Sequence, residues 1–406
     1  MRVHVFDPGL DSLKGHHANY DRTLTRAFDA LGLPTTIYAY ATPSDPRAWA
    51  NIRVEPFFFW SSYYRLLPTD SPHRLRDAGW VFYLQLARLD PAAFAPDDIL
   101  LFHSLTAEQL GGIGRWIAEW PSERRPRFVF LFMFADYRDA EGAERGAYLE
   151  AYRGFLADLQ PFAEHCRLFA EHSLMQADLQ RFGAGRLPVA IAPHVKHVPA
   201  SKARPLPPGG KLTIGYFGHA ERADKGAHLL PDIVAEIGRR QDVDWLVQLS
   251  FGRSQAPLSG AWTPAAIGAA LSSRADVTLI EGALSEEDYY GALDAADVVL
   301  LPYSPLYARQ GSGVFYEALV LGKALVLPRD GFMRKDLEEA GGIGHFFDRW
   351  DAASIASALD AALHDPRTRA IPNRHAGAAW QAARNLEDFA RALTAWPQTE
   401  TSDNRA

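Results

Sequence analysis

Residues 298–327 read VVLLPYSPLYARQGSGVFYEALVLGKALVL. The apolar run at 298–302 predicts a buried strand, the pattern at 314–321 predicts a helix, and the run at 324–327 predicts a second strand. Gly311 and Gly313 allow close backbone approach, and the helix that starts there presents unpaired N–H groups. The segment therefore predicts a strand–loop–helix–strand unit with an anion site at the start of its helix. A plain loop-to-helix turn is the alternative.

The same alternation extends along the whole chain. Strands are predicted at 3–6, 35–39, 99–102, 128–132, 166–170, 189–192, 212–217, 245–249, 277–280, 298–302 and 324–327. Helices are predicted at 19–31, 107–120, 227–239, 285–295, 314–321, 354–363 and 376–393. Strands that alternate with helices predict parallel βαβ units with right-handed crossovers. We therefore expect an α/β protein with two Rossmann-like, doubly wound parallel-sheet domains facing a cleft.

A proline- and glycine-rich stretch, PASKARPLPPGG at 199–210, marks the expected boundary between these domains. We predict a first domain over 1–200, a linker over 201–210 and a second domain over 211–375. A C-terminal helix at 376–396 is expected to pack back on the first domain, and 397–406 is a polar tail.

Composition excludes several classes of protein. The chain has 406 residues, 48% of them hydrophobic and 22% charged, which excludes a collagen, a coiled coil and a disordered chain. Acidic residues outnumber Lys and Arg by 49 to 42, so nothing favours nucleic-acid binding. The single cysteine, Cys166, excludes a disulfide framework and is expected to be a small buried residue. With no signal peptide and no apolar run of about 18 residues, a cytoplasmic protein is expected.

Several nucleotide and metal motifs are missing. The chain contains no GxxxxGK[ST], no G-x-G-x-x-G after a predicted strand and no H-E-x-x-H. The nearest glycine cluster, 111–114, lies inside a helical pattern. We therefore expect neither a cofactor nor a metal ion.

A second informative segment is IGYFGHAERADKGAHLL at 214–230. Here a predicted strand leads into a loop that carries His219, Arg222 and Lys225. Two cations at the carboxyl end of a strand suit a diphosphate, and solvated surface charges are the alternative. Glu317 lies one turn into the helix that follows G-S-G, where a carboxylate can accept a vicinal diol. A solvated carboxylate is the alternative there.

Together these segments resemble the retaining nucleotide-sugar glycosyltransferases of the GT-B fold, specifically glycosyltransferase family 4. The layout resembles that family along essentially the whole chain, and the specific motifs lie in the C-terminal half. The loop G-H-A-E-R-A-D-K-G is similar to the family's G-R…K-G loop, which holds the donor diphosphate. Lys225 matches the family's lysine. His219 takes the place of the arginine, and Arg222 is expected to supply the guanidinium.

The stretch ADVVLLPY…SGVFYEALVLGKALVLP resembles the family's signature of two glutamates eight positions apart. Glu317 matches the second, which in the family grips the nucleotide ribose. Arg309 stands in place of the first, as in a variant subgroup with R-x-x-S-G-V-F. We hypothesise that Arg309 binds the diphosphate or an anionic sugar such as a uronic acid. The preceding LIEGALSEEDYYGALDAADVVL matches the strand whose end, near Glu281 and Gly282, would read the base.

The N-terminal half carries fewer signals. Gly15 stands where the family has a glycine that meets the donor phosphate. His103 ends a predicted strand where the family often has a histidine beside the donor sugar; a satisfied histidine at the edge of the core is the alternative. His16, His17 and Tyr20 are candidates for acceptor binding, and the two adjacent histidines are also candidates for a general base. Solvated rings near a helix start are the alternative. Glu171 and His172 are weaker candidates.

An aromatic stretch, PFFFWSSYY at 56–64, has two interpretations. In the first, the stretch contributes to the hydrophobic core and to a lid. The second is a contact with the acceptor or with a membrane surface, since aromatic rings stack on sugars and lie at lipid interfaces.

The resemblance implies transfer of a sugar from a nucleoside-diphosphate sugar to a carbohydrate or lipid-linked acceptor, with retention and without a metal. It places the acceptor on the first domain and the donor on the second, with the leaving diphosphate taking the acceptor proton. Polysaccharide or glycoconjugate assembly in the cytoplasm, at the inner face of the membrane, is the expected setting. A nucleotide-sugar 2-epimerase and a non-catalytic binding protein of the same fold are the alternatives.

The residues expected to act fall into three groups. The catalytic group is His103, Lys225 and Glu317. The donor-binding group is Gly15, His219, Arg222, Lys225, Glu281, Gly282, Tyr303, Arg309, Gly311, Ser312, Gly313, Val314 and Glu317. The acceptor-binding group is His16, His17 and Tyr20.

Overall fold

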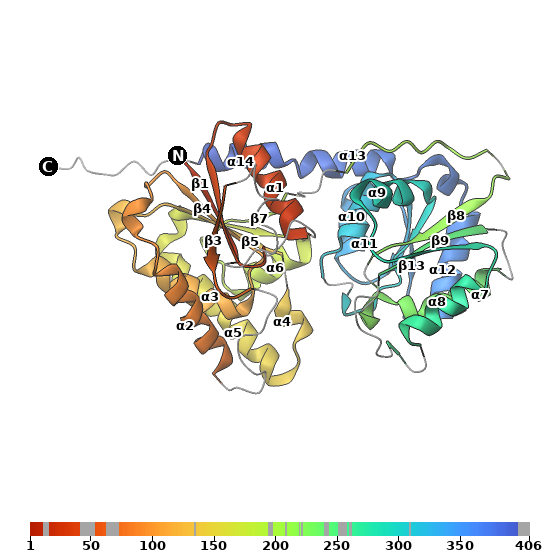
Figure 1. The fold of residues 1–406 in the computed structure, drawn as a ribbon, viewed down its shortest axis with the longest axis horizontal. Coiled ribbons are helices and arrows are strands. Elements are labelled where there is room, and N and C mark those ends of the chain that lie inside the picture. Colours follow the sequence, from red (N-terminus) through yellow and green to blue (C-terminus); the bar gives the residue numbers. More distant parts are fainter. Residues whose placement is uncertain are drawn as a thin grey trace. The chain divides into compact units, whose positions relative to one another are not determined.

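The computed structural model describes residues 1–10, 16–40, 53–61, 73–133, 135–193, 198–207, 209–218, 220, 222–238, 243–250, 258–259, 262–307 and 310–396. The chain divides into two compact units (Figure 1). The first unit comprises Met1–His197 and Arg384–Ala406, and the second comprises Val198–Ala383. Among the described residues, no helix is long and apolar enough to cross a membrane.

The first unit contains a parallel sheet of seven strands in the order β3-β2-β1-β4-β5-β6-β7. Its strands are β1 (Val3–Asp7), β2 (Thr35–Tyr40), β3 (Val54–Phe58), β4 (Ile99–His103), β5 (Arg127–Phe132), β6 (Cys166–Ala170) and β7 (Val189–Ile191). Its helices are α1 (His16–Asp29), α2 (Arg74–Leu86), α3 (Ala107–Ala118), α4 (Asp136–Asp139), α5 (Gly142–Leu159), α6 (Ser173–Phe182) and α14 (Leu386–Thr394).

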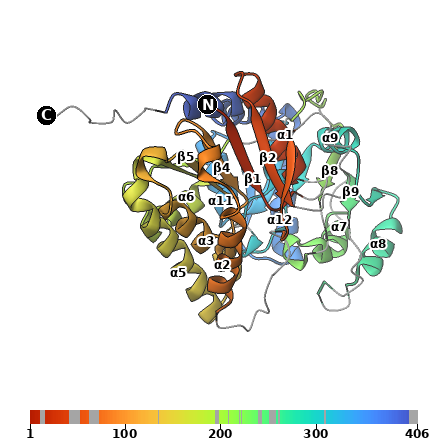
Figure 2. The same ribbon diagram turned by 60° about the vertical axis from the view of Figure 1, so that its left-hand side comes forward.

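Side chains that alternate along these strands fill two separate cores, because successive residues of a strand point to opposite faces. Phe6, Phe102 and Phe130 pack under the helices α2, α3 and α5. Val5 and Leu101 pack with α1 and α14 on the other face. Figure 2 shows α2, α3 and α5 gathered beside the sheet, and Figure 1 shows α14 lying along α1. The sheet is therefore covered on both faces, as a parallel sheet requires.

The second unit repeats the plan with six parallel strands in the order β10-β9-β8-β11-β12-β13. Its strands are β8 (Leu212–Tyr216), β9 (Val243–Leu249), β10 (Val277–Glu281), β11 (Val298–Leu300), β12 (Ala324–Pro328) and β13 (Gly344–Phe347). Its helices are α7 (Leu230–Gly238), α8 (Pro264–Ser272), α9 (Glu286–Ala295), α10 (Gly313–Val320), α11 (Phe332–Glu339), α12 (Ala352–His364) and α13 (Arg374–Ala383). Two doubly wound parallel sheets confirm the predicted fold class.

The differences from prediction have local causes. The single helix predicted at 376–393 is wrong: it is two helices, α13 and α14, because the Asn385 side chain accepts from the N–H groups of Glu387 and Asp388 and starts a new helix. The helix predicted from 227 begins as a 3₁₀ turn over Ala227–Leu229, and α7 follows with Pro231 in its first turn. The cap by Ser285 on α9 is confirmed.

In the described part of the aromatic stretch, residues 56–61, most side chains belong to the core. Phe57, Phe58 and Trp60 are buried, whereas Phe59 is 56% exposed. The remainder, 62–64, lies outside the described residues. Cys166 is buried as predicted, and burial raises the pKa of its thiol to about 12.

Helices α2 and α3 approach closely at two glycines, which gives a stability prediction. A Cβ added to Gly112 would stand 2.2 Å from the carbonyl oxygen of Gly79, whereas one added to the neighbouring Gly111 would meet open space. We expect Gly112→Ala to lower the free energy of unfolding by roughly 1–3 kcal/mol. Gly111→Ala should raise it by about 0.5–1 kcal/mol, since alanine favours a helix. Urea unfolding followed by circular dichroism measures both, and equal effects would contradict the close approach.

Candidate functional site

Each sheet has one point at which its strand order reverses. In the first unit this point lies between β1 and β4, and in the second it lies between β8 and β11. Doubly wound sheets bind ligands beyond the carboxyl ends of the strands at this point. The two candidate regions below lie there, one in each unit.

The first region is a buried group of five side chains, which we call the His103 cluster: Asp7, His17, Tyr20, Asp21 and His103. Asp7 ends β1. Its carboxylate accepts from the Gly9 N–H at 2.8 Å and lies 2.7 and 2.8 Å from Nδ1 of His17. His103 ends β4, with Nε2 2.7 Å from Oδ1 of Asp21 and 3.2 Å from Oδ2 of Asp7. The Tyr20 ring stacks on the imidazole of His103, with centroids 4.9 Å apart.

Charges in the cluster fix the protonation of His103. Burial by itself disfavours the charged ring, but Asp7 and Asp21 together outweigh it and raise the pKa of His103 to about 10. Although burial opposes it, the two histidines hold the pKa of Asp7 well below its usual range. Burial raises the pKa of Asp21 to about 6. At neutral pH, His103 is therefore an imidazolium held between two carboxylates.

This protonation makes stability depend on pH. A histidine whose pKa is about 10 in the folded protein and near 6.5 when unfolded contributes stability that is fully present below about pH 6.5. The contribution is lost as the pH rises toward 10, by up to about 1.4 kcal/mol per pH unit for one proton. Urea unfolding at intervals between pH 6.5 and 10 tests this. NMR of ¹⁵N-histidine, with the His103 signal assigned by comparison with His103→Gln, should show a charged ring at pH 8, and a neutral ring there would contradict it.

Three of the cluster residues have donor atoms close enough to hold a metal ion. Ligand atoms of Asp7, His17 and His103 lie within 4.8 Å of one another. Nδ1 of His17 and Nε2 of His103 both lie within hydrogen-bond distance of the Asp7 carboxylate. The set is satisfied by hydrogen bonds, so we do not assign these residues as metal ligands.

The remaining N-terminal candidates are only partly described. His17 and Tyr20 are buried rather than solvated, and the second ring nitrogen of His103 pairs with the Ser104 hydroxyl at 2.9 Å. Gly15 and the side chain of His16 lie outside the described residues. His172 caps α6 by accepting from the Met175 N–H, a structural role within this unit.

The second region is built from the loops after β8 and β11. The guanidinium of Arg222 is bonded to Asp224, with Nε at 3.0 Å from Oδ1. Arg222 and Lys225 both lie over the ring of Tyr307, 5.1 and 5.3 Å from its centroid. Two cations therefore lie over one aromatic ring.

The two loops are held tightly together. Gly226 has a φ of +75°, and a Cβ there would stand 2.1 Å from the carbonyl oxygen of Pro302. The Ser304 N–H donates to the carbonyl of Asp224 at 2.8 Å, and Trp350 donates to that of Pro302 at 2.9 Å. The loop carrying the cations is thereby fixed against the loop that leads into α10.

Helix α10 begins where the loops converge. The Ser312 hydroxyl accepts from the N–H of Phe315 at 3.3 Å and pairs with the Tyr303 hydroxyl at 3.1 Å. A Cβ added to Gly218, in the loop after β8, would stand 3.6 Å from Val314. Gly311 leads into this turn, and Gly313 is the first residue of the helix. The helix start thus lies against the loop after β8.

Glu317 is the most buried charged group of this region, at 1% exposure. Its carboxylate accepts from the hydroxyl of Tyr289 at 2.5 Å and from that of Tyr290 at 3.5 Å. Two tyrosines on α9 therefore orient a carboxylate on α10.

The end of β10, expected from the sequence to contact a base, is exposed, and the side-chain amide of Gln248 connects it to the loop after β8. Glu281 and Gly282 are exposed after β10. The buried Gln248 donates to the carbonyl of Gly282 at 3.1 Å and accepts from the N–H of Gly218 at 3.3 Å. His219 and Arg309 lie outside the described residues.

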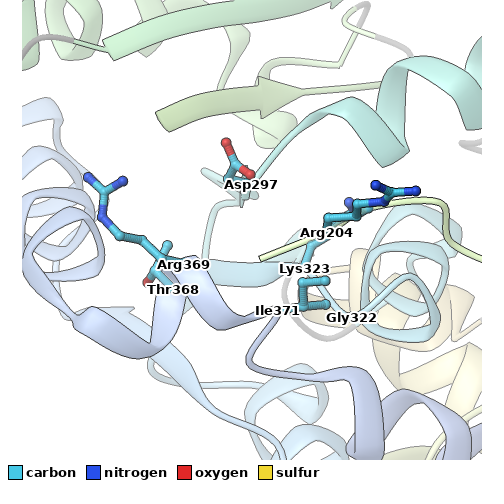
Figure 3. Close-up of a pocket in the computed structure, with 8 residues that line it drawn as sticks. Arg204, Asp297, Gly322, Lys323, Thr368, Arg369 and Ile371 are labelled. Carbon is cyan, nitrogen blue, oxygen red and sulfur yellow. The ribbon is translucent and has the colours of Figure 1, made fainter. Parts of the chain in front are cut away.

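A small pocket elsewhere in the second unit does not fit a phosphate. It lies at the amino ends of β11 and β12 and is lined by Ala203, Arg204, Asp297, Gly322, Lys323, Thr368, Arg369 and Ile371 (Figure 3). The guanidinium groups of Arg204 and Arg369 extend away from each other in Figure 3. Because ligands of such sheets bind at the carboxyl ends, we place the candidate site at the loops and not here.

The residues of these regions that sequence reasoning missed include Asp7, Asp21, Asp224, Gln248, Tyr289 and Tyr290. One signal was available, because His17 and Asp21 are four apart on a helix and so lie on one face. Gln248 and Tyr289 gave no signal, since their partners are distant in sequence.

Comparisons with known proteins identify the fold. No protein-family model matches the sequence, and no curated protein matches it. Among solved structures, the chain is similar to a sucrose-phosphate synthase from Thermosynechococcus elongatus, at 16% identity over 97% of each chain with a TM-score of 0.63. It is similar to Anabaena HepE in complex with UDP, at 13% identity over 97% of this chain and 98% of that one, TM-score 0.63. A third match is the catalytic domain of starch synthase IV from Arabidopsis thaliana, bound to ADP and acarbose, at 12% identity over 96% and 98%, TM-score 0.58.

These similarities, with the two parallel sheets, define a GT-B fold.

Proposed function

We propose that this chain is a glycosyltransferase that moves a sugar from a nucleoside-diphosphate sugar to a carbohydrate or lipid-linked acceptor. The observation that carries the proposal is the second region: at the switch point, two cations, a helix start and an oriented carboxylate come from loops that are fixed to one another. The similar HepE structure holds UDP and the similar starch synthase structure holds ADP, which supports a nucleoside diphosphate as the ligand class.

Each part of the second region has a task in the proposal. Lys225, Arg222 and the N–H groups at the start of α10 compensate the charge of the leaving diphosphate. Arg222 exchanges its contact with Asp224 for the phosphate. Glu317, held by Tyr289, accepts the ribose diol, and the exposed backbone near Gly282 contacts the base. Charge compensation by these groups requires no metal ion.

The proposal also includes four features that are supported by the family resemblance. They are membership of family 4, retention of configuration, an acceptor bound by the first unit, and a role in surface polysaccharide or glycoconjugate assembly. NMR of the anomeric proton of the product measures retention directly. A product of inverted configuration would contradict it.

A thermal-shift screen against nucleoside diphosphates and their sugars tests the function. A ligand at a hundred times its Kd stabilises a protein by about 2.7 kcal/mol. We expect a shift that is selective for one base and is lost in Lys225→Ala and Glu317→Ala. The absence of any shift from a folded protein would contradict the proposal and favour a non-catalytic protein of this fold.

The identity of Arg309 bears on the donor sugar. An arginine in place of the family's first glutamate supports an anionic sugar or a contact with the diphosphate. Wild type and Arg309→Ala are compared on a neutral and an acidic nucleotide sugar with the same base. Identical discrimination by the two proteins would eliminate the acidic-sugar idea.

A 2-epimerase is the second candidate, and the His103 cluster favours it. Epimerisation needs acid and base groups beyond those of simple transfer, and the cluster holds two histidines and two carboxylates. Incubation of the nucleotide sugar alone in D₂O distinguishes the two. An epimerase would produce the 2-epimer with deuterium at C2, whereas a transferase leaves C2 unchanged.

A further inference from the structure

Helix α1 brings two buried polar atoms beside His103 that have no hydrogen-bond partner among the described residues. One is Oδ2 of Asp21, and the other is the hydroxyl of Tyr20. Asp21 is completely buried, and Tyr20 is 5% exposed. Buried polar atoms in native proteins are almost always hydrogen-bonded, so two unpaired atoms on consecutive residues of one helix indicate a missing water or ligand group.

The other carboxylate oxygen of Asp21, Oδ1, is held in place. This oxygen accepts from Nε2 of His103 at 2.7 Å. The imidazole cannot turn away, because its other nitrogen pairs with Ser104 and its face stacks on Tyr20. The carboxylate therefore presents Oδ2 in a fixed orientation, which is the property of a preorganised binding group.

The charges around this oxygen limit what it can bind. Asp7 from β1 and Asp21 from α1 flank a single imidazolium, His103 from β4, and Glu171 after β6 lies near enough to act on Tyr20. An anionic ligand would be repelled by these carboxylates. A neutral hydroxyl group can donate to Oδ2 of Asp21, and a tyrosine hydroxyl can donate to or accept from a second one.

We propose that Oδ2 of Asp21 binds a hydroxyl group of the sugar acceptor, with the Tyr20 hydroxyl as a second contact. The proposal rests on the proposed glycosyl transfer and names the part of the first unit that recognises the acceptor. The location supports it, since the cluster lies at the switch point of the first sheet, while the cations suited to the donor diphosphate belong to the second unit.

Asp21→Asn tests this contact with defined probes: methyl glucopyranoside, methyl mannopyranoside and methyl galactopyranoside, with their monodeoxy derivatives. Saturation-transfer NMR and transfer assays measure binding and KM. A hydrogen bond to a charged group predicts a loss of about 10- to 100-fold in affinity for the glycoside. The KM of the nucleotide sugar should be unchanged. One monodeoxy glycoside lacks the hydroxyl group that Asp21 binds. Wild type should bind this derivative as weakly as Asp21→Asn binds the parent glycoside. The affinity of Asp21→Asn for the same derivative should be no lower than that of wild type.

Matched variants separate recognition from structure. Asp29→Asn makes the same change at the exposed end of α1 and should leave both substrates unaffected. Tyr20→Phe keeps the ring stack on His103 and should weaken glycoside binding several-fold. If Asp21→Asn does not fold, Tyr20→Phe still tests the site.

Three results would overturn the proposal. The first is wild-type behaviour of Asp21→Asn and Tyr20→Phe, which would leave only a water at this oxygen. The second is an effect on the nucleotide sugar alone. The third is no binding of any glycoside by a protein that does respond to a nucleotide. Failure of the proposed function is a different result, in which wild type responds to no nucleotide at all.

Discussion

Lys225→Ala should reduce the turnover of sugar transfer by about 10²- to 10³-fold, measured as the initial rate at saturating donor. The lysine lies in a loop fixed against Pro302 and over the ring of Tyr307, so its ammonium group is held where the diphosphate is proposed to leave. A charge placed in advance stabilises the leaving group without any reorganisation, whereas Arg222 first has to give up its contact with Asp224.

Lys335→Ala is the control for Lys225→Ala. Lys335 lies on α11 with its side chain about half exposed and paired with Glu339, so its removal should leave the rate within twofold of wild type. If Lys225→Ala raised only the KM of the donor and left turnover unchanged, the lysine would bind substrate without acting on the leaving group.

Asp7→Ala should lower the free energy of unfolding by about 3–5 kcal/mol. The carboxylate accepts from the Gly9 N–H and lies against His17 and His103, and its removal leaves a buried imidazolium with one carboxylate partner fewer. Guanidinium unfolding followed by tryptophan fluorescence measures the change.

Asp29→Ala removes a carboxylate from the exposed end of the same unit's first helix. It should change the stability by no more than about 0.5 kcal/mol. An Asp7→Ala variant as stable as Asp29→Ala would mean that the cluster contributes nothing to the folded state.

The fold could be predicted from sequence because its signals are local. Buried strands such as 128–132 are short apolar runs between turn residues, and their alternation with helices leaves few topologies. The strands β3 and β13 were not predicted. Val54–Phe58 contains Pro56, which argues against a strand unless it lies at an edge, and β3 is an edge strand. Gly344–Phe347 is only four residues long, too short to show a pattern.

Residues of the candidate site could be proposed from the sequence only where they lie in one continuous segment of the chain. Lys225, Ser312 and Glu317 belong to continuous strand–loop–helix segments, so their spacing carries information. Asp7 is one polar residue at the end of an apolar strand, and nothing in its neighbourhood shows that His103 will lie beside it. Contacts between the ends of adjacent parallel strands join residues about a hundred positions apart, and a single sequence does not encode them visibly.

The side-chain amide of Gln248 joins Gly282, in the exposed turn after β10, to Gly218, in the loop after β8 that carries Arg222 and Lys225. A displacement of either segment therefore has to strain or break the same pair of hydrogen bonds. Under the proposed function, a donor with the wrong nucleobase would displace the turn after β10 and, through Gln248, weaken the contacts of the loop after β8 with the diphosphate. Selection of the base would then appear as a slower reaction and not only as weaker binding, and substrate choice would be enforced during the chemical step itself.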